Sequence, residues 1–199
     1  MLRTKQLFDR EIVRSIDAVG LASAFHKITP SVLDFSDQLR FSLVHAVSAF
    51  DKYIHDLVYD KLVDIAEGNA PPARRFDSFK VSVQAALAAK NGVDTHSWLG
   101  PEIITQHGYL SFQRAEKVAD AIRLVVDEPL WPAVGAKLGR DATNVREDLD
   151  LIIDRRNKIV HEADWNPALQ DRWAMDEASC LAAIRMIKDI GDAIFDVAN

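Results

Sequence analysis

The longest uninterrupted apolar pattern in the chain has the repeat of an α-helix. Between residues 33 and 67, large apolar side chains recur every three or four positions, at Leu39, Leu43, Val47, Phe50, Ile54, Leu57 and Val58. Side chains with this spacing share one face of a helix, whereas a strand would alternate at every second position. The glycine and two prolines within residues 68–72 cannot continue a helix. The pattern therefore predicts one long helix over residues 33–67.

The same period predicts helices along most of the remaining chain. Their expected ranges are 2–27, 76–90, 111–126, 131–138, 141–163 and 177–197, with a turn at residues 29–31. Asp141 or Thr143 is the expected N-cap of the helix over 141–163, and Asp176 that of the last helix. We expect Gly20 to weaken the first helix, and residues 93–110, with two glycines and a proline, to be the least regular part. No segment alternates convincingly with period two, so the sequence predicts an all-α helical bundle without a significant sheet.

The composition is that of an ordinary globular protein. The chain has 199 residues, of which 48% are hydrophobic and 27% charged, which suits one domain over residues 1–199. Residues 1–30 either belong to its core or extend it. The single cysteine, Cys180, excludes an intrachain disulfide and fits a reducing compartment. No apolar run reaches membrane-spanning length, and residues 1–14 are too charged for a signal peptide, so we expect a cytoplasmic protein without membrane contact.

The charge balance limits how the chain can contact nucleic acid. Its net charge of −6 argues against broad, non-specific coating of nucleic acid, and leaves room only for a small basic cleft. Arg74 and Arg75, which follow two prolines, are expected in a solvated loop, with RNA contact as a minority interpretation.

An arginine interrupts the apolar face of the helix predicted over 141–163. The apolar positions are Val145, Leu149, Ile152, Ile159 and Ala163, and Arg156 fills the gap of seven between Ile152 and Ile159. A charge in an apolar stripe is costly unless it is paired or meets an anion. The alternative is that the aliphatic stem packs while the guanidinium reaches solvent or a carboxylate. Both interpretations stay open.

Asn157 and His161 complete a set of groups suited to chemistry on a phosphodiester. The set contains a fixed cation, a hydrogen-bonding amide and an imidazole that exchanges protons near neutral pH. Asn157 is four residues before His161, where its amide can bond the imidazole. Arg156 and His161 point about 140° apart on an ideal helix. One site uses both if the arginine reaches round, if the helix unwinds before Pro167, or if two copies of the helix face each other across a dimer axis.

The spacing by itself is weak evidence, because an arginine followed by four to six residues and a histidine occurs about once by chance in such a chain. The same spacing also occurs from Arg40 to His45. There we expect an arginine that is packed or at the surface, and a histidine whose hydrogen bonds are made within the protein. His45 and His55, with Asp51 between them, are expected to make their hydrogen bonds at contacts between helices.

Residues 154–164 (DRRNKIVHEAD) resemble the signature helix of the HEPN superfamily, and the chain is similar to its RiboL-PSP-HEPN group. Supporting segments are 39–57 (LRFSLVHAVSAFDKYIHDL), 111–124 (SFQRAEKVADAIRL) and 130–139 (LWPAVGAKLG). The superfamily motif is an arginine, preferably followed by Asn, Asp or His, and then a histidine after four to six positions. Arg156, Asn157 and His161 match it.

The resemblance implies an antiparallel helical bundle that forms a homodimer, in which two such helices build one cleft. It also implies metal-independent endoribonuclease activity without a cofactor, in a toxin–antitoxin or anti-phage defence system. The hypothesis is attack of a ribose 2′-OH on the adjacent phosphate, giving 2′,3′-cyclic phosphate and 5′-OH ends. Arg156 would stabilise the developing charge, His161 would act as general acid or base, and Asn157 would orient His161 or the phosphate.

Further residues are candidates for RNA contact around this site. Arg155, Lys158 and Arg146 are candidates for binding the RNA backbone, although solvated helix charges are an equal interpretation of the first two. Trp165 is close enough to His161 in sequence to stack a base.

Two other functions stay open. Some superfamily members only bind, so the chain is alternatively an inert scaffold that docks a partner such as a nucleotidyltransferase-type antitoxin, with Arg156 as an interface anchor. A DNA-binding helix-turn-helix over residues 133–150 is disfavoured, because Glu147, Asp148 and Asp150 would repel phosphate.

Overall fold

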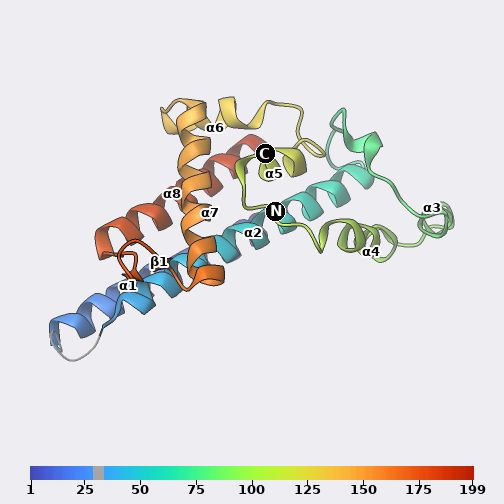
Figure 1. The fold of residues 1–199 in the computed structure, drawn as a ribbon. Helices are drawn as coiled ribbons and strands as arrows, with labels where there is room; N and C mark the ends of the chain where they lie inside the picture. The colour runs from blue at the N-terminus through green and yellow to red at the C-terminus, as the bar shows by residue number, and fades with distance from the viewer. Residues whose placement is uncertain (29–33) are drawn as a thin grey trace.

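The computed structural model describes residues 1–28 and 34–199, and within these ranges the protein is all-α (Figure 1). The helices are α1 (Leu2–Ile28), α2 (Ser36–Ala66), α3 (Val83–Lys90), α4 (Thr95–His107), α5 (Ala115–Ile122), α6 (Leu130–Leu138), α7 (Ala142–Glu162) and α8 (Glu177–Ala198). A 3-10 turn, η1 (Phe76–Ser78), precedes α3, and β1 (Trp165–Asn166) pairs antiparallel with β2 (Asp171–Arg172) after α7. The predicted turn at 29–31 and helix start at 33 lie outside the described residues.

The long helix α2 is the axis of the fold. Helices α1, α4, α5, α7 and α8 all pack against it. Helix α1 runs antiparallel to α2, because Thr4 donates to Asp60 Oδ2 at 2.6 Å near one end and Ser15 Oγ lies 2.9 Å from His45 Nδ1 farther along. The predicted apolar face of α2 is buried along its whole length. Helix α1 is continuous through Gly20, so Gly20 does not interrupt the helix.

The core is densest where α1, α2 and α8 meet. The ring of Phe8 stacks on that of Tyr53 with centroids 4.5 Å apart. Gly191 of α8 faces this stack, and a Cβ at its position would lie 2.4 Å from the Phe8 ring. The apolar period of the last helix predicts that positions 181, 184, 187, 190 and 194 face inward. This is confirmed, because the four isoleucines among them are fully buried and Leu181 is partly buried against the core. Among the described residues no helix is long and apolar enough to cross a membrane.

The segment expected to be least regular contains a helix. Asp94 caps α4 by accepting a hydrogen bond from Ser97 N at 3.1 Å, and the helix continues through Pro101. The predicted helix over 76–90 is split, because Ser82 is extended and its hydroxyl caps α3. The predicted helix over 111–126 is shortened to α5. Asp51 holds the chain before α5 in an extended form, since it accepts from Phe112 N at 2.6 Å and from the Gln113 side chain at 3.0 Å.

Helix α7 crosses α2 and carries the candidate site. Asp141, and not Thr143, is its N-cap, accepting from Thr143 N at 2.8 Å. Its fully buried positions are Val145, Leu149 and Ile153, whereas the predicted Ile152 and Ile159 are partly buried and Ala163 is exposed. Ala163 leaves the helical register because it adopts a left-handed conformation (φ 51°) that ends α7. Asp176 caps α8, as predicted.

Candidate functional site

Arg156 lies on the inward side of α7, in line with the buried Leu149 and the partly buried Ile159. One of its terminal nitrogens donates to Asn157 Oδ1 at 3.0 Å. Its Nε is buried and has no hydrogen-bond acceptor in the described part of the chain. The described residues also offer this guanidinium no ion pair within 4.0 Å. The arginine in the apolar stripe is therefore held in orientation but not neutralised.

The structure shows no hydrogen bond between Asn157 and the imidazole of His161, although their spacing on the helix would allow one. The side-chain oxygen of Asn157 is used by Arg156, so Asn157 orients the guanidinium and not the imidazole. His161 is exposed in the last turn of α7, and its ring has no hydrogen bond to any described residue. The imidazole is thus open to solvent, to substrate or to a second protein surface.

Arg156 and His161 remain on different sides of α7. The helix continues through Glu162, so unwinding before Pro167 does not bring them together. Five helical positions separate the two residues by about 7.5 Å along the axis and about 140° around it. Two arrangements remain by which one site could use both residues. Either the Arg156 side chain reaches round α7 toward His161, or a second copy of α7 supplies one of the two groups.

A surface cavity of about 580 Å³ opens on the side of α7 that carries Asn157. Its lining residues are Arg114, Leu151, Asp154, Arg155, Asn157, Lys158, Glu162 and Trp173. Lys158 Nζ lies 5.4 Å from the centre of the Trp173 ring, a cation–π distance. Arg114 pairs with Asp154, and this ion pair raises the pKa of Arg114. The cavity thus combines an amide, an aromatic face and an ammonium group.

Of the predicted residues, Asn157, Lys158 and Arg155 line this cavity, whereas Arg156 and His161 do not. Trp173 takes the place that was expected for Trp165, which is 49% exposed on β1 outside the cavity. Sequence reasoning missed Arg114 and Trp173. Neither carries a local signal, because α5 and the β1–β2 hairpin reach the cavity only through the tertiary fold.

Arg155 has a structural partner that the sequence did not reveal. It donates to the fully buried Asp164 at 2.8 Å and to the carbonyl oxygens of Trp173 and Ala174 at 3.2 and 3.0 Å. Burial, together with the nearby Arg40, lowers the pKa of Arg155 despite the attraction of Asp164. Because one of its terminal nitrogens is engaged by three acceptors within the protein, the placement favours a structural role over contact with an RNA backbone.

Arg40 completes this clamp from α2. It is 4% exposed and donates to Asp164 Oδ2 at 2.7 Å, to Trp173 O at 2.7 Å and to Ser36 Oγ at 2.6 Å. The expectation that Arg40 is packed is confirmed. We call Arg40, Asp164 and Arg155 the arginine clamp, because they fasten α2, α7 and the hairpin together.

Arg146 lies apart from the other predicted residues, near the start of α7. It lines a second cavity, of about 450 Å³, together with Arg74, Arg75 and Arg123. None of the other residues predicted for the site lines this cavity.

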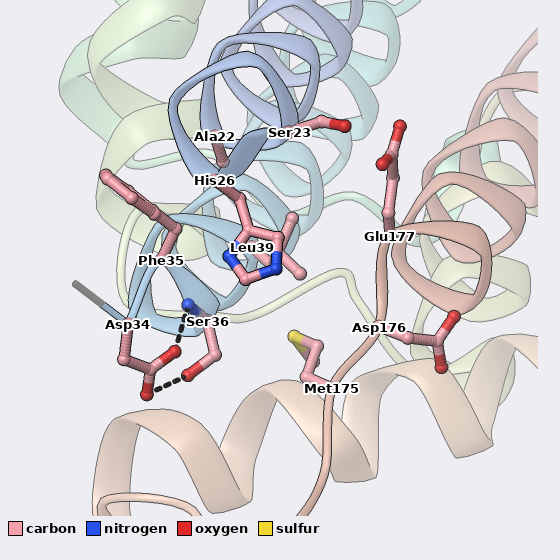
Figure 2. A pocket seen from close by; sticks show the side chains of 10 residues that line it. All are labelled: Ala22, Ser23, His26, Asp34, Phe35, Ser36, Leu39, Met175, Asp176 and Glu177. Carbon is pink, nitrogen blue, oxygen red and sulfur yellow. Dashed lines mark hydrogen bonds between the residues drawn. The ribbon is translucent and has the colours of Figure 1, made fainter. Parts of the chain in front are cut away.

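A third cavity, of about 220 Å³, lies between the end of α1, the start of α2 and the start of α8. Figure 2 shows the side chains that surround it, with Asp34 bonded to Ser36. These bonds from Ser36 lower the pKa of Asp34, and bonds from Ser179 at the start of α8 lower that of Asp176. Both carboxylates are therefore occupied by local hydrogen bonds, and none of the residues predicted for the candidate site lines this cavity.

Over residues 1–28 and 34–199, no group of three or more His, Cys, Asp or Glu side chains is placed to hold a metal ion. No family model, curated protein or solved structure matches the chain.

Proposed function

We propose that this protein is a metal-independent endoribonuclease of HEPN type that acts as a homodimer. The observation that carries the proposal is the state of Arg156, which is fixed by Asn157 and has a buried Nε without an acceptor. An oriented but unneutralised guanidinium is suited to a phosphate, because its planar fork matches two phosphate oxygens.

The surface of α7 supports a second copy as the partner. Val160 is 46% exposed and projects between Arg156 and His161, about 40° from the former and about 100° from the latter on an ideal helix. A two-fold contact over this end of α7 would cover the exposed Val160 and bring two arginines and two histidines to one cleft. Within such a cleft, Arg156 of one copy and His161 of the other would share a substrate.

The proposed reaction needs proton transfer and charge stabilisation. The 2′-oxygen of a ribose forms a bond to the adjacent phosphorus while the bond from phosphorus to the 5′-oxygen breaks. A neutral imidazole of His161 takes the proton from the 2′-OH, and a protonated one gives a proton to the leaving 5′-oxygen. Arg156 stabilises the negative charge that develops on the non-bridging oxygens. The products are a 2′,3′-cyclic phosphate and a 5′-OH.

Single replacements test this assignment. Arg156→Ala and His161→Ala are each expected to slow cleavage of single-stranded RNA by at least about 100-fold, the scale of acid–base and electrostatic contributions. Arg185→Ala, at an exposed position of α8, is the matched control and should cleave at the parental rate. End-group analysis of the parental products should find the cyclic phosphate. If correctly folded Arg156→Ala and His161→Ala variants cleave as fast as Arg185→Ala, the proposal fails.

The alternative is a catalytically inert docking module. It is favoured by the separation of Arg156 and His161 within one chain, and by the exposed Leu151 and Val160 on α7. A docking module would cut no RNA and would be monomeric when purified alone. A dimer that releases cyclic-phosphate ends contradicts it.

A further inference from the structure

Four arginines converge on the second cavity from distant parts of the sequence. Arg74 and Arg75 come from the loop after α2, Arg123 follows α5, and Arg146 lies on α7. The acidic residues that line the same cavity are Asp127 and Glu128. The lining is thus net positive in a chain whose net charge is −6. We call this cavity the arginine cavity.

The arginines differ in how far they are already engaged. Arg123 pairs with Asp120 at 2.8 Å, and Arg74 Nε lies 3.9 Å from Asp127 Oδ2. The guanidinium groups of Arg75 and Arg146 have no hydrogen bond or ion pair with any residue that the structure describes. These two groups are therefore available to a ligand without breaking an existing contact.

The start of α6 also lines the cavity and adds a further favourable site for negative charge. Trp131 is 6% exposed, and its indole N–H donates to Ala115 O at 2.9 Å. The cavity also holds the first turn of α6, whose N-cap residue, Pro129, offers no side-chain cap. Uncapped N–H groups and the positive end of the helix dipole favour an anion there. Guanidinium groups and a helix N-terminus together are the chemistry of a phosphate site.

The arginine cavity lies on the same side of α7 as the candidate site. Arg146 and Asn157 are eleven positions apart, which places them about 16 Å apart along the axis and about 20° apart around it. Arg114, which pairs with Asp154, lies between them and borders the cavity at Asn157. Arg146 thus lies in line with Asn157, whereas Lys158, which also borders the cavity at Asn157, lies about 120° around α7 from Arg146.

We infer that the arginine cavity holds backbone phosphates of a single-stranded RNA, a few nucleotides away from the bond that is cleaved. This inference rests on the proposed ribonuclease function for the identity of the strand. The cavity contributes affinity and not chemistry, because it lies far from Arg156 and His161. Phosphate contacts of this kind are independent of base sequence and weaken as salt rises.

The test compares two double variants of the full chain. Arg75→Ala with Arg146→Ala removes the two unengaged guanidinium groups, and Arg10→Ala with Arg185→Ala removes two exposed arginines from α1 and α8. The probe is a 2′-O-methyl oligoribonucleotide, which cannot be cleaved and is long enough to span both cavities. Its dissociation constant is measured over a range of salt concentrations, together with the rate at which a dinucleotide is cleaved.

Arg75→Ala with Arg146→Ala is expected to weaken binding about tenfold or more, and to lower the slope of log K against log salt by about 1.4, for two lost phosphate contacts. The control pair should keep the parental slope and cleave the dinucleotide at the parental rate. Arg146→Ala alone should lower the slope by about half as much. Equal slopes for the two double variants, or a parental protein that does not bind the probe, overturn the inference. If Arg156→Ala still binds the probe and the parent releases no cyclic-phosphate ends, the ribonuclease proposal fails while the arginine cavity stands.

Discussion

Arg40 and Asp164 form a buried ion pair, with 2.7 Å between Nε and Oδ2, although 124 positions separate them in the chain. Asp164 is fully buried and adopts a left-handed conformation (φ 59°) immediately after α7. It also accepts from Arg155, so one carboxylate serves two guanidinium groups. The arginine clamp therefore sets where α7 ends relative to α2, and with it the place of His161.

We expect Asp164→Asn to destabilise the protein by about 3–5 kcal/mol, because it leaves the buried guanidinium of Arg40 and the partly buried one of Arg155 without their counter-charge. Asp148→Asn is the matched control, since Asp148 pairs with Arg140 at the surface and its loss should cost less than about 1 kcal/mol. Urea unfolding measures both free energies. Similar losses for the two variants would show that the clamp contributes no more than a surface pair.

Mixed dimers should reveal whether Arg156 and His161 act across the subunit interface. A dimer of one Arg156→Ala chain and one His161→Ala chain keeps one intact pair only when the arginine and histidine of a site come from different copies. Isolated by two different affinity tags, this dimer should recover up to half of the parental cleavage rate. No recovery would mean that each site takes both groups from the same chain.

Stability should fall as the pH is lowered below about 6.5, because of His107. This residue is 8% exposed, lies against the rings of Phe79 and Phe112, and has a buried Nδ1 without an acceptor among the described residues. Burial, and then the nearby His55, lower its pKa below the ordinary value of 6.5. The unfolded chain therefore binds this proton at a higher pH than the folded chain, so folding loses free energy as the pH falls through that window.

His107→Leu should remove part of this dependence, because leucine cannot be protonated. His26→Leu, at an exposed position of α1, should leave it as in the parent. Urea unfolding between about pH 5 and 8 separates the two cases. An unchanged pH dependence in His107→Leu would contradict the role assigned to burial.

Gly191 is required where α8 approaches α1. An added Cβ would lie 2.4 Å from the Phe8 ring, which is itself buried and stacked on Tyr53. We expect Gly191→Ala to destabilise the protein by about 1–3 kcal/mol. Gly20→Ala is the control, because nothing lies within 4 Å of its added Cβ, and it should stabilise α1 by about 0.5–1 kcal/mol. Thermal unfolding measures both, and a neutral Gly191→Ala would show that the helices separate at little cost.

Much of the fold was predictable because its signals are local. The apolar period of α2 and α8 depends on residues three and four positions apart, and it correctly predicted their buried faces. The caps at Asp141 and Asp176 act within three residues, so they also followed from the sequence. The shortened start of α5 did not, because Asp51 holds that segment from 61 positions away.

The candidate site divides in the same way. Residue spacing alone was enough to predict that Arg156 interrupts an apolar face, and that Asn157 and His161 occupy the last turns of the same helix. The hydrogen bond from Arg156 to Asn157, the commitment of Arg155 to Asp164 and the meeting of Arg146 with arginines from two other segments became evident only in the folded chain. Helical period and capping follow from neighbouring residues, whereas the partner of a charge depends on which distant segments the packed core brings beside it.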